Sequence, residues 1–310
     1  MSKILVIPDV HLKPWMFEKA DKLASEGNYD GVVILGDLID DWAQGMNLDL
    51  YNETFDAAIA FIKKHKSTYY CYGNHDVSYL WEFKESGYSE YARDIVVDRM
   101  QELKNELPPE KCAFIHKIDN TLFSHAGLTS NFVCEHFGGW LEHGQSADDI
   151  EYMVEQINNM SKFDLWKPNS PIWARPQFAY SGGMIRLYPM YQVVGHTPVE
   201  GPLEENMLLT LDTFSTYRTG GAIGDEKFVW VDTVAKTWQY AECTNSHYSE
   251  QIKSSCPKCG NKPRNIEYQN CGPIVRISCP KCGFFCDEYD GLEQGYKDIF
   301  EYWNNQDSES

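Results

Sequence analysis

The chain has 310 residues, and at about 150 residues per domain this length suggests about two domains. Hydrophobic residues make up 43% of the sequence and charged residues 24%, which excludes an intrinsically disordered chain and favours a sizeable core. Acidic residues outnumber basic residues by 46 to 27, and the net charge of -19 disfavours bulk binding to nucleic acids or anionic membranes. Because no apolar run reaches the roughly 18 residues that cross a bilayer, we expect no membrane association and a cytoplasmic location.

The first part of the chain alternates short apolar runs with helical patterns. Strands are predicted at residues 3–7, 31–35 and 68–72, and helices between them at residues 14–25 and 52–64. Asn52 is the predicted N-cap of the second helix, because Phe55 and Ile59 follow it at helical spacing. This alternation predicts an α/β fold with a βαβαβ core.

The later elements are predicted from shorter signals. They are a helix at residues 88–106, a hairpin of strands at 112–118 and 120–124, a helix at 146–160 with Ser146 as its N-cap, and strands at 192–194, 207–211, 228–231 and 238–241. The short spacing of the last four strands predicts that they are largely antiparallel. We therefore expect a body at residues 1–243, a polar linker at 244–255 and a small domain at 256–305.

Polar side chains follow the predicted strands at their carboxyl ends, which converge on one crevice in an open α/β sheet. These side chains are Asp9, His11, Asp37, Asn74, His125 and His196. A mixture of oxygen and imidazole ligands suits Mn, Fe or Zn. Six ligands are too many for one tetrahedral ion, so we predict a dinuclear centre that Asp37 bridges. Gly36, Gly73 and Gly195 are expected to allow sharp turns after the strands.

Five motifs occur in order over residues 9–197, namely D-x-H, G-D-x-x-D, G-N-H-[DE], H-[AG]-G and G-H. The ordered set resembles the calcineurin-like metallophosphoesterases. This resemblance implies a β-sandwich flanked by helices and a metal-dependent phosphoesterase activity. The H-A-G form at His125 and the Trp-Ala-Arg triplet at residues 173–175 resemble the bacterial and phage phosphoprotein-phosphatase branch, which also includes the symmetrical diadenosine tetraphosphatases.

The resemblance also implies roles for single residues. Asp9, His11 and Asp37 would hold the first metal, and Asp37, Asn74, His125 and His196 would hold the second. A hydroxide that bridges the metals would attack phosphorus in line. His75 would act as general acid toward the leaving oxygen, with Asp40 orienting its ring. Arg175 is the best candidate for a clamp on the phosphoryl group, because its bidentate fork suits tetrahedral oxyanions.

The chain departs from that branch at Asp41 and Trp42, where arginine and glycine are usual. A carboxylate there repels a phosphate dianion, which favours a substrate whose apolar or aromatic group meets Trp42, Trp15 or Trp173. Phosphomonoester hydrolysis, as in serine/threonine phosphatases, is the leading hypothesis, with a small molecule, nucleotide or phosphoprotein as substrate. The alternatives are hydrolysis of a dinucleoside polyphosphate or nucleotide phosphodiester, and a binding protein that acts through its C-terminal domain.

The C-terminal region contains paired cysteines. Cys256 and Cys259 form one C-x-x-C-G knuckle, and Cys279 and Cys282 form another. Together they predict one tetrahedral structural zinc in a reducing compartment, and a helix is predicted at residues 292–303. The module resembles the zinc-ribbon proteins of the restriction alleviation family. That resemblance implies a phage or bacterial origin, with the host cytoplasm as location if phage-encoded. The ribbon is also a candidate surface for a protein partner.

Overall fold

The computed structural model describes residues 2–138, 146–176 and 190–241, and in the C-terminal part residues 249–252, 256, 258–261, 264–268, 274–279, 281–282 and 285–289. The chain divides into two compact units, Met1–Trp238 and Gln239–Ser310. Each unit is described by itself.

A six-stranded sheet forms the first layer of the larger unit. Its strands, in sheet order, are β11 (Thr237–Tyr240), β10 (Val229–Asp232), β1 (Lys3–Ile7), β2 (Gly31–Ile34), β3 (Thr68–Cys71) and β4 (Cys112–Ala113). The strands from β1 to β4 are parallel, and β10 runs antiparallel to β1. The continuous apolar sequences of β1 and β2 are buried, as is typical of parallel strands covered on both faces. The predicted βαβαβ core is therefore confirmed.

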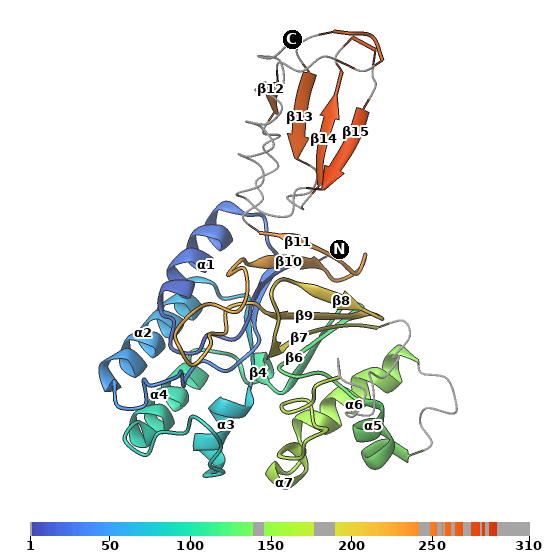
Figure 1. Ribbon diagram of the computed structural model, residues 1–310. Helices are drawn as coiled ribbons and strands as arrows, with labels where there is room; N and C mark the ends of the chain where they lie inside the picture. The colour runs from blue at the N-terminus through green and yellow to red at the C-terminus, as the bar shows by residue number, and fades with distance from the viewer. Residues whose placement is uncertain are drawn as a thin grey trace. The chain divides into compact units, whose positions relative to one another are not determined.

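A layer of three helices covers the outer face of this sheet. It consists of α1 (Trp15–Glu26), α2 (Leu48–Lys64) and α4 (Arg93–Asn105), which pack side by side (Figure 1). The prediction of Asn52 as an N-cap is wrong, because α2 begins at Leu48. Asn52 lies inside the helix and donates its side-chain N–H to the carbonyl of Leu48 (3.2 Å). The helix starts one turn earlier because Tyr51 is fully buried there.

A five-stranded sheet forms the second layer. Its strands, in sheet order, are β5 (Ile115–Ile118), β6 (Thr121–Ser124), β7 (Tyr191–Pro198), β9 (Leu208–Asp212) and β8 (Leu203–Glu205). β5 and β6 form the predicted hairpin, but Cys112 and Ala113, which the sequence places in it, belong to the other sheet. The expectation of largely antiparallel strands is wrong for β7, which pairs in parallel with β6 and β9. The edge strand β8 reverses the chain between β7 and β9, so β9 can run in the direction of β7.

The remaining elements of the larger unit are short helices. They are α3 (Asn74–Trp81), η1 (Pro109–Lys111), α5 (Ser130–Phe137), α6 (Ala147–Asn158) and α7 (Lys162–Leu165). Ser146 caps α6 as predicted, because its hydroxyl accepts the backbone N–H of Asp149 (3.2 Å). Helices α5 to α7 gather on the opposite side of the sheets from α1 and α2 (Figure 1). The result is a mixed α/β sandwich of two sheets flanked by helices, as the fold prediction states.

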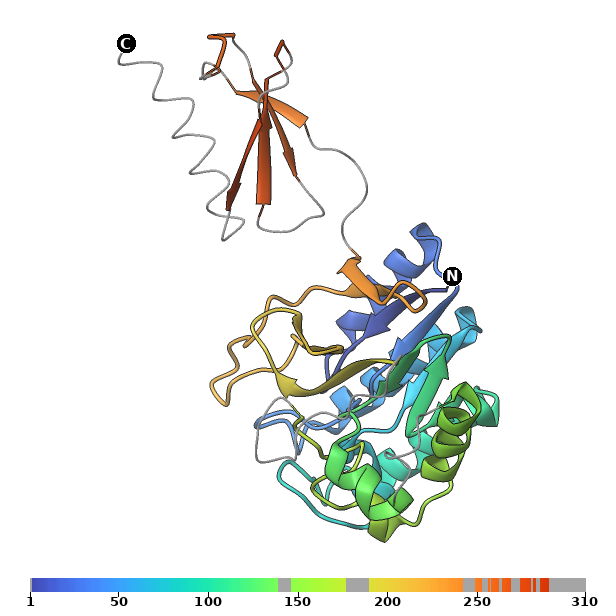
Figure 2. The same ribbon diagram turned by 90° about the vertical axis from the view of Figure 1, so that its right-hand side faces the viewer.

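The two sheets contact each other through buried side chains. Nε2 of His116 on β5 lies 3.0 Å from the carbonyl of Tyr70 on β3, and Cys71 Sγ lies 3.6 Å from the carbonyl of Phe123 on β6. Figure 2 shows the strands of both sheets after a turn of 90°. The carboxyl ends of β1, β2 and β3 therefore meet those of β6 and β7 at one edge of the sandwich.

The smaller unit contains a four-stranded antiparallel sheet. Its strands, in sheet order, are β12 (Ser249–Ile252), β13 (Arg264–Tyr268), β14 (Ile274–Ser278) and β15 (Phe285–Tyr289). β12 lies within residues 244–255, the segment predicted to be a polar linker. The predicted helix at residues 292–303 lies outside the described residues, and the domain boundaries stay a prediction.

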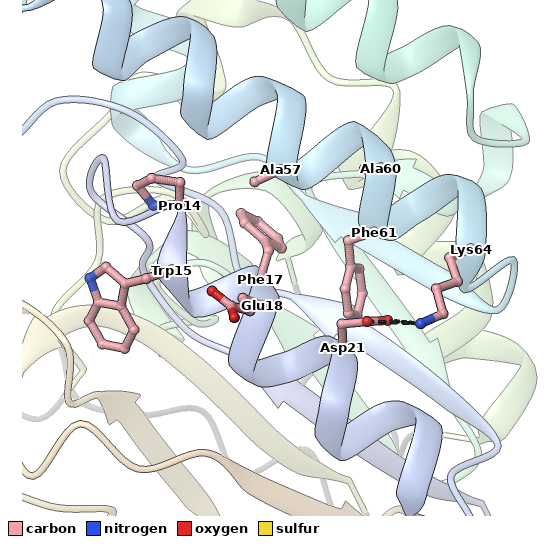
Figure 3. A pocket seen from close by; sticks show the side chains of 9 residues that line it. All are labelled: Pro14, Trp15, Phe17, Glu18, Asp21, Ala57, Ala60, Phe61 and Lys64. Atoms are coloured by element: carbon pink, nitrogen blue, oxygen red, sulfur yellow. Dashed lines mark hydrogen bonds and ion pairs between the residues drawn. The ribbon is translucent and has the colours of Figure 1, made fainter.

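A groove of about 500 Å³ lies between α1 and α2 (Figure 3). Its walls are largely apolar, and an ion pair between Asp21 and Lys64 (2.7 Å) closes one end. None of the predicted metal ligands lines it. Among the described residues, no helix combines the length and apolarity that a membrane crossing demands.

Candidate metal centre

Four polar residues at the predicted strand ends have a left-handed backbone. The φ angle is 44° at His11, 47° at Asp37, 65° at Asp40 and 61° at His196. Such conformations cost about 1–3 kcal/mol each in residues other than glycine, and the surrounding structure must enforce them. Their concentration where β1, β2 and β7 meet marks this edge as a functional site.

Asp37 lies at the centre of the cluster. Its Oδ2 is 3.2 Å from Nε2 of His125 and 3.9 Å from Nε2 of His11. Nε2 of His125 is also 3.0 Å from Oδ1 of Asn74 and 3.0 Å from Nδ1 of His196. Asp37 therefore has imidazole groups on two sides, as expected for a carboxylate that bridges two cations.

Asp9 completes this set from the end of β1. Its Oδ1 accepts the backbone N–H of His196 (2.9 Å) and lies 3.8 Å from Nδ1 of His125. The structure thus brings all six predicted ligands together. Asp9 Oδ2 and His196 Nε2 are buried and have no hydrogen-bond partner. Because unpaired buried polar atoms are costly, their presence fits a site that binds cations.

Two of the histidines are held in a defined tautomer. Nδ1 of His11 lies 2.8 Å from the carbonyl of Asp40, and Nδ1 of His125 lies 2.8 Å from the carbonyl of Leu35. A carbonyl oxygen only accepts, so each Nδ1 must carry the proton. Each Nε2 is then directed toward Asp37 with its lone pair available, which is the arrangement that metal-binding histidines commonly use.

Glycines bring the carboxylates close to the backbone. A Cβ atom at Gly73 would lie 2.1 Å from Asp37 Oδ1, and one at Gly195 would lie 1.9 Å from Asp9 Oδ2. Of the three glycines predicted to allow turns, only Gly36 has a positive φ, of 96°. A positive φ is therefore not the reason for glycine at positions 73 and 195, where the absence of a side chain leaves room for a carboxylate.

The electrostatics of the cluster also favour cation binding. Burial raises the pKa of Asp9 well above its ordinary range, and the neighbouring Asp212 and Asp37 raise it further. Burial opposes charge on His125, but Asp37 outweighs it and raises the His125 pKa to about 9. Divalent cations would reduce the repulsion between the buried carboxylates. They would also take the place of the proton that the His125 ring attracts.

His75 is held by two carboxylates. Its Nδ1 lies 3.0 Å from Asp40 Oδ2 and 2.6 Å from Glu85 Oε1. Burial disfavours a charged ring, but Asp37, Asp40 and Glu85 together raise the pKa of His75 well above its ordinary value. The Asp40 carboxylate is fixed in turn by the hydroxyls of Tyr51 (2.7 Å) and Tyr79 (2.6 Å), which donate to its Oδ1.

Sequence reasoning assigned no role to three carboxylates of this region, although Asp76 fills the last position of the G-N-H-[DE] motif. Glu85 lies in a loop without a motif, so no sequence signal indicates it. Asp76 accepts the backbone N–H groups of Asp37, Leu38 and Gly73, and so fixes the loops that carry the ligands. Asp212 ends β9 and is buried near Asp9, and its position directly after a predicted strand could have indicated it.

The sequence model of the calcineurin-like phosphoesterases matches residues 2–200, about two thirds of the chain. The chain belongs to the calcineurin-like phosphoesterase family. It is accordingly a metal-dependent hydrolase of phosphate esters, and the sandwich described above is the fold of this family.

Solved structures with a similar fold include three that differ in origin. A serine/threonine phosphatase from Saccharomyces cerevisiae, with similarity to human phosphatase PP5, is 15% identical over 74% of this chain and 72% of its own, with a TM-score of 0.41. A metallophosphoesterase from Sphaerobacter thermophilus is 14% identical over 77% and 87%, with a TM-score of 0.36. TT1561 from Thermus thermophilus is 13% identical over 77% and 97%, with a TM-score of 0.36. No curated protein matches the chain significantly.

Arg175 of this calcineurin-like phosphoesterase lies beside the metal centre. Its Nη1 donates to the carbonyl of His196 (2.8 Å) and to Oγ1 of Thr197 (3.2 Å). The preceding Trp173 packs edge-on against the His196 ring, with the centroids 5.8 Å apart. These contacts hold the guanidinium next to His196, a predicted metal ligand, and within the described part of the chain no other hydrogen bond of the guanidinium is found.

The unusual Asp41 of this phosphoesterase is paired with a cation. Its Oδ2 lies 3.6 Å from Nζ of Lys13, and Nζ also donates to the carbonyl of His11 (3.2 Å). Oδ1 of Asp41 accepts a hydrogen bond from the hydroxyl of Thr216 (3.0 Å). Lys13 therefore offsets much of the repulsion that the Asp41 carboxylate would exert on a phosphate dianion.

The four knuckle cysteines lie together in the smaller unit. Their Sγ atoms are all within 4.8 Å of one another. Sγ of Cys256 is 3.6 Å from Sγ of Cys282, and Sγ of Cys259 is 3.6 Å from Sγ of Cys279. All four are free thiols. Four sulfurs at about 2.3 Å from a tetrahedral zinc would be about 3.8 Å apart, close to these distances.

Proposed function

We propose that this phosphoesterase hydrolyses phosphomonoesters, as serine/threonine phosphatases do, with two divalent cations of Mn, Fe or Zn. The observation that carries the proposal is the buried donor set around Asp37, in which Asp9 Oδ2 and His196 Nε2 have no protein partner. Asp9, His11 and Asp37 would hold one cation, and Asp37, Asn74, His125 and His196 the other. When bound, the cations supply Lewis acidity toward the phosphate oxygens and lower the pKa of water.

His75 is proposed to donate the proton to the leaving oxygen. Its Nδ1 faces Asp40 and Glu85, so Nε2 is the nitrogen available to a substrate. Burial opposes a charged ring, but Asp37, Asp40 and Glu85 raise the pKa of His75 above its ordinary value, which favours the protonated form that a general acid needs. Asp40 is proposed to fix the ring orientation, because two tyrosine hydroxyls immobilise its carboxylate.

Arg175 is proposed to bind the phosphoryl group. Among the described side chains, Arg93 and Arg99 each pair with two carboxylates, whereas no carboxylate lies within 4.0 Å of the Arg175 guanidinium. An unpaired arginine beside buried metal ligands, in a chain with a net charge of -19, is well suited to an anionic substrate.

The test of this function is phosphate release with Mn across four substrates: an alkyl phosphate, a nucleotide diester, a dinucleoside polyphosphate and a phosphopeptide. A chelator serves as the control. We expect turnover of the monoester that the chelator abolishes. Faster release from the dinucleotide or diester would favour the alternative activity, and the absence of any metal-dependent release would contradict the proposal.

We also propose that the four cysteines bind one structural zinc, and that the ribbon is of the phage type and contacts a protein partner. The equal 3.6 Å separations of the two sulfur pairs support the zinc. A binding role through this unit is the second alternative to catalysis. One zinc per chain that persists after the active-site metals are removed would support the structural site.

A further inference from the structure

Two loops next to the metal centre hold a tryptophan and an arginine face to face. Nε1 of Trp42, in the loop after β2, donates to the carbonyl of Thr216 (3.0 Å), in the loop after β9. The Arg218 guanidinium lies over the Trp42 ring, 4.6 Å from its centroid. Asp41 binds both loops, because it accepts from the Thr216 hydroxyl and from the N–H of Trp42 (2.7 Å). Contacts between the two loops therefore hold the Trp42–Arg218 pair in place.

The pair is exposed, and both its side chains have groups that could contact a ligand. Trp42 is 41% exposed, although its indole N–H is already satisfied, so apolar ring surface faces solvent. Within the described part of the chain, no carboxylate lies within 4.0 Å of the Arg218 guanidinium, in contrast to Arg93 and Arg99. A fixed ring beside an unpaired guanidinium suits a planar aromatic group that also accepts hydrogen bonds.

The pair is linked through the chain to the residue that contacts the proposed acid. Asp40, directly before Asp41 and Trp42, contacts His75, the acid of the proposed function. We propose that Trp42 and Arg218 form a subsite for the nucleobase of a nucleoside phosphate substrate, an inference that rests on that proposed function. Trp42 is two residues beyond Asp40, or up to about 7 Å of chain, a distance that a ribose between the phosphate and the base can span. A phosphotyrosine ring lacks the ring acceptors that a nucleobase would offer to the Arg218 guanidinium.

The first test compares adenosine 5′-monophosphate with ribose 5-phosphate, which lacks only the base. In Trp42→Ala, we expect the ratio of kcat/KM for the nucleotide to that for the sugar phosphate to fall about tenfold, the effect of losing one base-stacking contact. Trp42→Phe should restore most of the ratio. Tyr152→Ala removes a similarly exposed ring, 54% exposed, on α6 and should leave the ratio at the wild-type value. An unchanged ratio in Trp42→Ala would overturn the subsite, as would a fall for phosphotyrosine alone.

The second test is independent of turnover. Equilibrium dialysis would measure adenosine 5′-monophosphate binding to metal-loaded His75→Asn protein, with and without Trp42→Ala. We expect the Kd to rise about tenfold when Trp42 is removed, and an equal Kd would overturn the subsite. If adenosine 5′-monophosphate binds in a way that depends on Trp42 but the wild type does not hydrolyse it, the proposed function is contradicted. The subsite then stands as a binding site for the nucleobase. If the wild type hydrolyses both substrates and the ratio of their kcat/KM values does not depend on Trp42, the subsite is overturned and the proposed function stands.

Discussion

Two glycines without a positive φ make room for the carboxylates of the metal centre. The G-N-H and G-H motifs identify Gly73 and Gly195 from the sequence, but the reason for glycine differs from the expected one. Turn chemistry is visible in a sequence because it is local. The contact between Gly195 and Asp9 joins residues far apart in the chain, so only the folded structure reveals it.

Gly195→Ala should therefore weaken metal binding. The added methyl group would lie 1.9 Å from Asp9 Oδ2, so the carboxylate must move away. We expect the metal affinity to fall by about 10–100-fold, as when groups that orient metal ligands are lost. Titration with Mn would measure it. Gly221→Ala is the matched control, because a Cβ there meets nothing within 4 Å, and equal affinities in the two variants would refute the steric explanation.

Glu85→Gln tests the second carboxylate on His75. Removing its charge weakens the interaction that helps to keep the ring protonated. We expect kcat to fall about tenfold or more for an alkyl phosphate, whose leaving group needs a proton, and much less for p-nitrophenyl phosphate. Glu90→Gln, at an exposed glutamate that pairs with Lys84, is the control. Equal losses for both substrates would argue against a role of Glu85 in proton donation.

At the level of the elements, the sequence predicts the parallel core well and the second sheet less well. β1 and β2 are short apolar runs and β3 is a short run of β-branched and aromatic residues, and this local composition identifies them as strands. The direction of β7 depends on the exposed edge strand β8, whose sequence Leu-Glu-Glu carries no strand signal. The start of α2 depends on burial of Tyr51 by other elements, which no local pattern records.

His116 on β5 gives the sandwich a dependence on pH. Burial lowers the pKa of His116 to about 4, whereas the unfolded chain keeps the ordinary value of about 6.5. Between these pH values the unfolded state binds more protons, so the free energy of unfolding falls as the pH falls. At about 1.4 kcal/mol per pH unit, the contribution of this residue is about 3 kcal/mol.

His116→Gln removes this titration. We expect urea unfolding of the variant to show a shallower loss of stability between pH values of about 6.5 and 4 than the wild type shows. Since the other titrating groups are common to both proteins, the difference between the two slopes isolates His116. Identical slopes would mean that the ring is already charged in the folded state.

At the scale of the whole molecule, the metal centre and the cysteine cluster lie in different units. We expect a chain that ends at Asn245 to hydrolyse p-nitrophenyl phosphate with the kcat/KM of the full chain, because all proposed ligands precede residue 197. Steady-state kinetics on the two purified proteins would measure this. Loss of activity in the shorter chain, with its secondary structure intact by circular dichroism, would show that the two parts work as one.

In the proposed mechanism Asp37 binds both metals, whereas His75 acts only in proton transfer. The most direct measurement is the metal content of Asp37→Asn and His75→Asn by mass spectrometry, together with their phosphate release from an alkyl phosphate. We predict that Asp37→Asn loses metal and turnover together, and that His75→Asn keeps its metal and loses turnover by about 100-fold or more. Full metal content in Asp37→Asn, or wild-type turnover in metal-loaded His75→Asn, would contradict this account.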